Sequence, residues 1–232
     1  MDENENKNIH KDHRKRLKAR FLNEGLEAFN DHNILELLLF YSIPRRDTND
    51  LSHQLISRFG SLSAVFDANY DELISCKGIS ENSAVLLKLI PKLSRAYLLD
   101  KDTRFSCFSD PNKLGKYLVN YFIGEKNEKL LALFFTSRTE LIDIAVISEG
   151  TVTATDVPVR RIAELGFSKN AAFIVLAHNH PDGTSTPSDE DISFTSKANE
   201  LFGKLGMPIV EHFVIGASSF ETIMGLDLNL NL

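Results

Sequence analysis

The chain has 232 residues, of which 43% are hydrophobic and 25% are charged, an ordinary globular composition. No apolar run approaches the roughly 20 residues that a membrane-spanning helix needs, and the N-terminal residues MDENENKNIHKDHRKR lack the apolar stretch of a secretory signal. These observations exclude an integral membrane protein and predict a folded protein of the cytoplasm.

The net charge of −6 is unevenly distributed along the chain. Residues 1–104 carry 16 Lys and Arg against 16 Asp and Glu, whereas residues 105–232 carry 10 against 16. Because neutralising nucleic-acid phosphates requires clustered Lys and Arg, the acidic second half is a poor candidate for a nucleic-acid surface. The one basic stretch runs from Lys11 to Arg20.

The first half of the chain predicts helices. Residues 1–12 are polar and hold too little apolar material to offset the entropy of ordering, so they are expected to be disordered. From residue 13 to residue 100, apolar residues recur at the spacings of buried helix faces, with Asp31 as one candidate N-cap and the Asp47–Asp50 segment as another. This half is therefore predicted to be a small all-helical domain.

A tight turn at Gly78 separates a helix that ends near Lys77 from one that restarts at Ser80 or Glu81. Such a helix-hairpin-helix can bind a DNA backbone, because the turn and the following helix N-terminus present backbone N–H groups to a phosphate. It can equally serve to pack a small helical domain. The turn lacks a second glycine that would let a phosphate approach most closely, and the sequence leaves both interpretations open.

The second half has a different pattern. Residues 101–111 are predicted to be a linker, because charges, serines and a proline interrupt the periodicity. Over residues 112–232, four apolar runs of strand length alternate with helical stretches, which indicates an α/β domain with a buried sheet. The strands are expected at residues 130–135, 140–148, 171–177 and 209–215, and the helices at residues 113–122, 158–166 and 189–205.

The third of these strands ends in polar residues, His178-Asn-His180-Pro. Alternate residues of an extended chain point to the same side, so both imidazoles are expected close enough together to share a metal ion. The next loop contains two prolines and Gly183 and turns the chain back, which can deliver Asp191 as a third ligand. Two imidazoles and one carboxylate leave a fourth tetrahedral position for water, as in catalytic zinc sites.

Zinc at this position would lower the pKa of a water and polarise a carbonyl, and a hydrolase would need one further group, a general base. Another interpretation requires no metal. Ser188 and Asp191 have the Ser-x-x-acid spacing of a capping box at the start of the next helix. For Ser188 both interpretations stay open.

The two histidines, the serine and the aspartate together resemble a known signature. His-x-His-Pro, then Ser-x-x-Asp with seven residues between the second histidine and the serine, is the pattern of the JAB/MPN (JAMM) metalloproteases. The wider sequence resembles RadC, the bacterial branch of that superfamily, over nearly the whole chain from about residue 13. The stretches that carry this resemblance are LAHNHP, TPSDEDISFT, EHFVIG, ELLLFYSIPRRDTNDLSHQLISRFGSLSAVF and ELISCKGISENSAVLLK.

The resemblance implies a fold and a set of metal ligands. The fold would be a C-terminal JAB/MPN domain of the cytidine-deaminase-like type, preceded by the helix-hairpin-helix-like domain. The ligands of a Zn²⁺ ion would be His178, His180 and Asp191. Ser188 would hydrogen-bond the attacking water or the developing oxyanion, a role that suits a small hydroxyl beside a metal.

The resemblance also implies a general base, a glutamate on the first core strand. The matching residue is Glu128, fifty residues before His178, although Glu125 and Glu149 lie nearby in the sequence. The chain departs from the usual RadC pattern at residues 157–161 and 45–49, so substrate and DNA contacts are not carried over.

Two functions are therefore expected as alternatives. In the first, the protein is a zinc metallopeptidase or isopeptidase that cleaves a peptide or protein, with Glu128 moving the proton from water to the leaving nitrogen. In the second, residues 13–98 bind DNA and the zinc domain is a non-catalytic scaffold. The letters His-Asn-His do not indicate a nuclease, because that motif spreads its residues over a finger-like unit. The sequence names neither the substrate nor the oligomeric state.

Overall fold

The computed structural model describes residues 3–102, 110–150 and 159–225, with side chains from residue 13 onward. The chain divides into two compact units, Met1–Leu93 and Ser94–Leu232. The first unit is helical and the second is built on a β-sheet, which confirms the predicted fold class. Within the described ranges, no helix combines the length and apolar character that crossing a bilayer requires.

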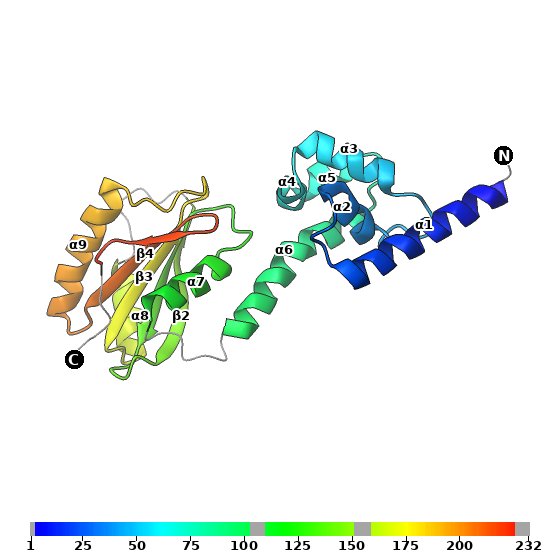
Figure 1. Ribbon diagram of the computed structural model, residues 1–232. Coiled ribbons are helices and arrows are strands. Elements are labelled where there is room, and N and C mark those ends of the chain that lie inside the picture. The colour runs from blue at the N-terminus through cyan, green and yellow to red at the C-terminus, as the bar shows by residue number, and fades with distance from the viewer. Residues whose placement is uncertain (1–2, 103–109, 151–158, 226–232) are drawn as a thin grey trace. The chain divides into compact units, whose positions relative to one another are not determined.

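The first unit is made of helices, several of which pack around an apolar core (Figure 1). This core contains Leu35, Leu39, Leu55, Leu73 and Leu87, each at most 1% exposed. The helices are α1 (Glu3–Glu24), α2 (Asp31–Leu39), α3 (Asn49–Phe59), α4 (Leu62–Asp67), α5 (Tyr70–Ile74) and the first part of α6 (Glu81–Asp102).

The predicted pair of helices joined by a tight glycine turn is present as α5 and α6. Gly78 has a φ of +100°, a left-handed conformation that favours glycine. One candidate N-cap lies one residue from its predicted place: Asn30 occupies the N-cap position of α2, and Asp31 is the first helical residue. The N-cap position of α3 is Thr48, which lies within the predicted Asp47–Asp50 segment.

Three boundaries differ from those predicted. Helix α1 begins at Glu3, inside the segment expected to be disordered, because its Glu and Lys residues favour helix. Helix α6 continues to Asp102, inside the predicted linker, whose residues 103–109 lie outside the described residues. The division between the two units falls after Leu93 instead of after residue 100.

The second unit contains the predicted strands and helices around one five-stranded sheet. The sheet has the order β2-β1-β3-β4-β5, and β5, a three-residue edge strand, was not predicted. The strands are β1 (Lys129–Phe135), β2 (Leu141–Glu149), β3 (Phe173–Asn179), β4 (Ile209–Ile215) and β5 (Phe220–Thr222), and the helices are α7 (Pro111–Tyr121), α8 (Val159–Ser168) and α9 (Asp189–Lys204).

The sheet is mixed. Strand β1 pairs antiparallel with β2 and β3, whereas β3 pairs parallel with β4, and α9 makes the crossover between them. Because β1 and β3 run in opposite directions, the start of β1 lies at the same edge of the sheet as the end of β3. Residues about fifty positions apart therefore meet at this edge.

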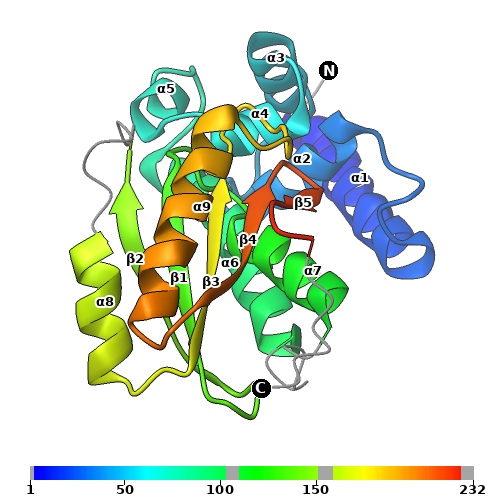
Figure 2. The ribbon, with the colours of Figure 1, turned by 90° about the vertical axis from the view of Figure 1, so that its left-hand side faces the viewer.

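Each face of the sheet is covered by helices (Figure 2). Helix α7 packs on one face, where Leu114 and Leu118 contact an apolar cluster that includes Leu133 and Phe213. Helices α8 and α9 cover the other face, through Ile162, Ala198 and Phe202 among others. Strands β1, β3 and β4 are thus buried on both faces, and polar side chains that point from them into either face need partners.

Candidate metal centre

The two histidines after β3 lie side by side, as the alternation of an extended chain predicts. The Nε2 atoms of His178 and His180 are 3.0 Å apart. His178 is only 3% exposed and points toward the α9 side of the sheet, like Leu176 two residues earlier. The site therefore sits at the edge where β3 leaves the sheet, beneath the start of α9.

Asp191, on the first turn of α9, completes a three-residue cluster. Its Oδ1 lies 3.3 Å from the Nε2 of His178, and its Oδ2 lies 3.6 Å from the Nε2 of His180. Ligands at 2.0–2.1 Å from a tetrahedral zinc ion are about 3.3 Å from one another. The spacing and the chemistry of this donor set therefore fit a zinc ion.

Two glycines fold the chain back from His180 to Asp191. Gly183 has a φ of +88°, its N–H donates to the carbonyl of His180 at 3.0 Å, and its own carbonyl accepts from Ala217 at 3.0 Å. Gly216 packs so tightly against this turn that a Cβ there would lie 2.6 Å from the Gly183 carbonyl oxygen. The turn after β4 thus holds the loop that carries the third ligand.

Ser188 and Asp191 form the predicted capping box as well. The Ser188 hydroxyl accepts from the Asp191 N–H at 3.1 Å and donates to Asp191 Oδ2 at 2.7 Å, and the Ser188 N–H donates to the same oxygen at 2.9 Å. Burial works to raise the pKa of Asp191, but the nearby His178 and the hydrogen bonds from Ser188 outweigh it and hold that pKa well below its usual range. The carboxylate therefore both caps α9 and faces the histidines.

Behind His178 lies a second row of buried polar groups. Its Nδ1 is 2.8 Å from the Nε2 of His212 on β4, and the Nδ1 of His212 is 2.7 Å from the hydroxyl of Thr195 on α9. Burial, together with the nearby His178, lowers the pKa of His212 to about 3, so this imidazole is neutral. Sequence reasoning gave neither His212 nor Thr195 a role.

Glu128, the predicted general base, is half-buried and directly precedes β1. In the antiparallel register, Leu130 pairs with His178, so Glu128 is level with His180 two residues further along. Its backbone is held from the other side as well, because its carbonyl accepts from Gly150 at 2.8 Å. The segment is thus aligned with the metal-ligand edge of β3.

The two neighbouring glutamates are engaged in ion pairs. Glu125 contacts Arg95 and lies 2.6 Å from the ammonium group of Lys129. Burial works to raise the pKa of Glu125, but Lys129 and Arg95 outweigh it and lower that pKa. Glu149 lies 3.4 Å from the same ammonium group. The Glu125 carboxylate is therefore stabilised in its charged form by cations and is a weaker base than an unpaired glutamate, while Glu149 is engaged in an ion pair.

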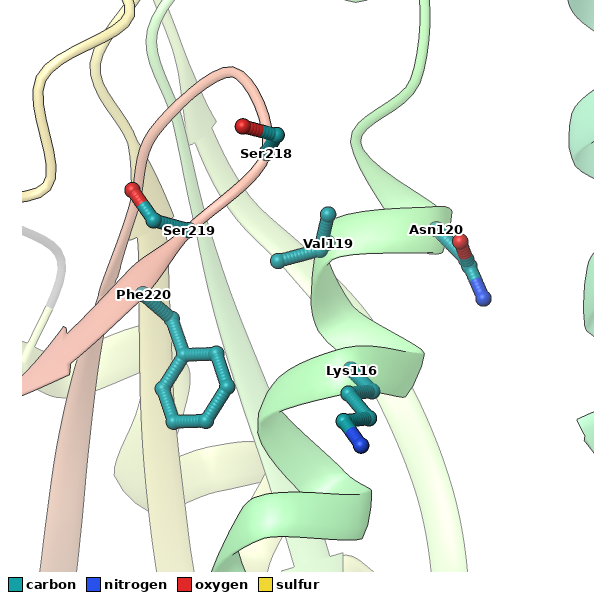
Figure 3. Close-up of a pocket in the computed structure, with 6 residues that line it drawn as sticks. All are labelled: Lys116, Val119, Asn120, Ser218, Ser219 and Phe220. Atoms are coloured by element: carbon teal, nitrogen blue, oxygen red, sulfur yellow. The ribbon is translucent and has the colours of Figure 1, made fainter.

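A separate pocket of about 470 Å³ lies between α7 and the β4–β5 turn (Figure 3). Its lining includes Lys116 and Asn120 of α7 and Phe220 of β5. None of the three candidate metal ligands lines it, and α7 covers the sheet face opposite α9. This pocket is therefore not part of the candidate metal centre.

Comparisons with known proteins agree with this architecture. A family model described as the RadC-like JAB domain matches residues 108–226. The UPF0758 protein FN0909 of Fusobacterium nucleatum is 35% identical over 221 residues, which cover 91% of this chain and 94% of the relative. The UPF0758 protein SPO0054 of Ruegeria pomeroyi is 32% identical over 212 residues, which cover 90% and 93%. The similarities to these two relatives extend over both units, whereas the family model matches the second unit.

Proposed function

The chain belongs to the RadC family of JAB-domain proteins, and on this basis we propose that it is a zinc-dependent metallopeptidase or isopeptidase that cleaves an amide bond in a peptide or protein. The observation that carries the proposal is the cluster of His178, His180 and Asp191, whose ligand atoms are spaced as on a tetrahedral zinc ion. Three protein ligands leave a fourth position open, which favours catalysis over a structural role.

Zinc bound there supplies a Lewis acid that makes water more acidic and polarises an amide carbonyl. The residues of this chain supply the proton transfer. Glu128 takes the proton of the attacking water and passes it to the leaving nitrogen. The strand register supports this role, because it places Glu128 opposite His180. The neighbouring Glu125 and Glu149 are engaged in ion pairs, which also favours Glu128 as the base.

Ser188 stabilises the negative charge that develops on the carbonyl oxygen of the substrate. The Ser188 hydroxyl otherwise donates to Asp191 Oδ2, with 2.7 Å between the two oxygens, and for this step it rotates to donate to the substrate. The N–H of Ser188 bonds the same carboxylate oxygen at 2.9 Å, so Asp191 remains oriented while the hydroxyl moves.

The test begins with the metal content of the purified full-length chain, measured by elemental analysis beside the double variant His178→Ala/His180→Ala. We expect one zinc per chain in the wild type and none in the variant. A wild-type chain that stays free of zinc after reconstitution would refute the proposal.

Activity is then measured against a library of quenched fluorescent peptides. Glu128→Gln should keep its zinc and lose turnover, because an amide cannot accept the proton. Glu125→Gln and Glu149→Gln are the matched controls and should keep turnover. Equal activity of Glu128→Gln and the wild type would remove Glu128 from the mechanism.

The alternative function is DNA association of the first unit, favoured by the glycine turn between α5 and α6. Part of the basic stretch is already engaged within the unit. The guanidinium group of Arg14 donates to the carbonyl of Ile43 at 2.7 Å, and that of Arg20 pairs with Glu24. A gel shift with duplex DNA that weakens steeply with added salt would favour this function, and no shift at low salt would dismiss it.

A further inference from the structure

A row of buried hydrogen bonds connects His178 to the backbone of Asp191. It runs from His178 Nδ1 to His212 Nε2 (2.8 Å), from His212 Nδ1 to the Thr195 hydroxyl (2.7 Å), and from that hydroxyl to the Asp191 carbonyl (2.6 Å). His178 is 3% exposed, and His212 and Thr195 are each 1% exposed. Solvent therefore does not decide where the protons of this row reside.

The direction of the row follows from counting protons. A carbonyl oxygen only accepts, so the single hydroxyl proton of Thr195 goes to the Asp191 carbonyl. The hydroxyl oxygen must then accept from His212, so Nδ1 of His212 carries a proton. Since this imidazole is buried, the charged form is disfavoured and its Nε2 keeps a lone pair.

The same count fixes the proton of the metal-ligand histidine. The Nε2 lone pair of His212 needs a donor, and Nδ1 of His178 is the ring nitrogen 2.8 Å away. Neutral His178 therefore carries its proton on Nδ1 and its lone pair on Nε2. That Nε2 atom is the one that faces His180 and Asp191, at 3.0 Å and 3.3 Å.

We infer that His212 and Thr195 are positioning residues, which hold His178 in the Nδ1–H tautomer and so present its Nε2 lone pair to the metal ion. A metal-ligand histidine usually donates its other N–H to a carboxylate, a backbone carbonyl or water. Here an imidazole and a hydroxyl stand between the ligand and the carbonyl, and that carbonyl belongs to the third ligand. The row thus couples β3 to α9. The inference deepens the proposed function and rests on it for the metal.

The first test requires no metal. The chelated full-length protein, labelled with ¹⁵N in its histidine rings, is studied by long-range ¹H–¹⁵N NMR at about pH 8.5, above the ordinary imidazole pKa of about 6.5. The resonances are assigned by their loss in His178→Gln and His212→Gln. We expect Nδ1–H for both rings. An Nε2–H tautomer at either ring would overturn the inference, whether or not the chain proves to bind zinc.

The second test removes the hydroxyl. Thr195→Val keeps the shape of the side chain and leaves His212 without its acceptor, so zinc affinity should fall roughly 10- to 100-fold, as for lost partners of metal-ligand histidines. Thr195→Ser should restore the affinity to within about threefold, because the hydroxyl returns. Affinity is measured by competition with a fluorescent chelator.

The matched control is Thr48→Val in the first unit. Thr48 is also fully buried, and its hydroxyl also donates to a carbonyl, that of Glu36 at 3.3 Å. The Thr48→Val variant should leave zinc affinity unchanged. Wild-type affinity in Thr195→Val, or no recovery in a folded Thr195→Ser, would show that this hydroxyl does not act on the metal site.

Discussion

The side chain of Asn179 hydrogen-bonds the backbone on both sides of Glu128. Its Oδ1 accepts from the N–H of Lys129 at 2.9 Å, and its Nδ2 donates to the carbonyl of Asn127 at 3.1 Å. Asn179 is 4% exposed and lies between the two histidines of the metal cluster. The residue that separates the metal ligands thus aligns the proposed base with them.

Asn179→Ala should cut turnover more than tenfold while zinc content stays at the wild-type value. It removes both hydrogen bonds that flank Glu128, and it should also cost about 1–3 kcal/mol of unfolding free energy. Elemental analysis, urea unfolding and peptide cleavage separate these effects. Loss of zinc in a folded Asn179→Ala would assign Asn179 to the ligand side of the site instead.

Gly216→Ala should destabilise the chain by about 2 kcal/mol or more. A Cβ at this position meets backbone atoms of Gly183 and Thr184 at 2.6 Å and 3.0 Å, and backbone cannot move aside cheaply. Gly203→Ala is the matched control, since a Cβ there meets nothing within 4 Å and lies in α9. It should stabilise by about 0.5–1 kcal/mol. Equal urea midpoints for the two variants would contradict the tight packing.

Ser188→Ala should cost about 1 kcal/mol of unfolding free energy, the usual effect of losing an N-cap, and should retain one zinc per chain. The N–H of Ser188 continues to hold Asp191 Oδ2 at 2.9 Å. The control is Ser61→Ala, which removes the cap of α4 in the first unit and should lower stability without any change in zinc affinity. A zinc-free Ser188→Ala would mean that the hydroxyl is needed to keep Asp191 in place.

The zinc-free protein should lose stability as the pH falls below about 6.5. Burial lowers the pKa of His212 to about 3 in the folded chain, whereas an imidazole in the unfolded chain titrates at about 6.5. Between these values only the unfolded chain binds the proton, so the unfolding free energy falls by up to about 1.4 kcal/mol per pH unit. Above about pH 6.5 both states are neutral and His212 contributes no slope.

Urea midpoints at about pH 7 and pH 5 measure this slope. The lowered pKa of Asp191 adds to the loss only below about pH 4, where a carboxylate in the unfolded chain titrates. His212→Gln should have a shallower slope than the wild type between the two values. An unchanged slope would show that another group is responsible.

The sequence was most informative where local pattern decides structure. The apolar runs of β1, β3 and β4 predicted the sheet, and the spacing from His178 to Asp191 predicted which side chains the fold brings together. Both depend on short-range alternation and on one loop closed by glycine. Strand β5 has only three residues, which is too short for an alternating apolar pattern to be recognised in the sequence.

The role of His212 depends on how β4 pairs with β3, and this pairing register cannot be read from the local sequence pattern. The pairing of β3 with β4 shifts between Ile174 and Val175, so that Val210 is an extra residue on β4. Strict alternation from Ile209 would have turned His212 to the α7 face, away from His178. The bulge reverses this and aims the ring at the metal cluster.

The double use of Asp191 has a consequence for metal exchange. Helix α9 needs its capping box whether or not an ion is present, so the carboxylate is kept in place by the folding of the helix itself. An ion that leaves this site leaves behind a third ligand that does not relax away. Zinc should therefore dissociate and rebind without a refolding step, and Asp191 would keep its ligand position in the empty site.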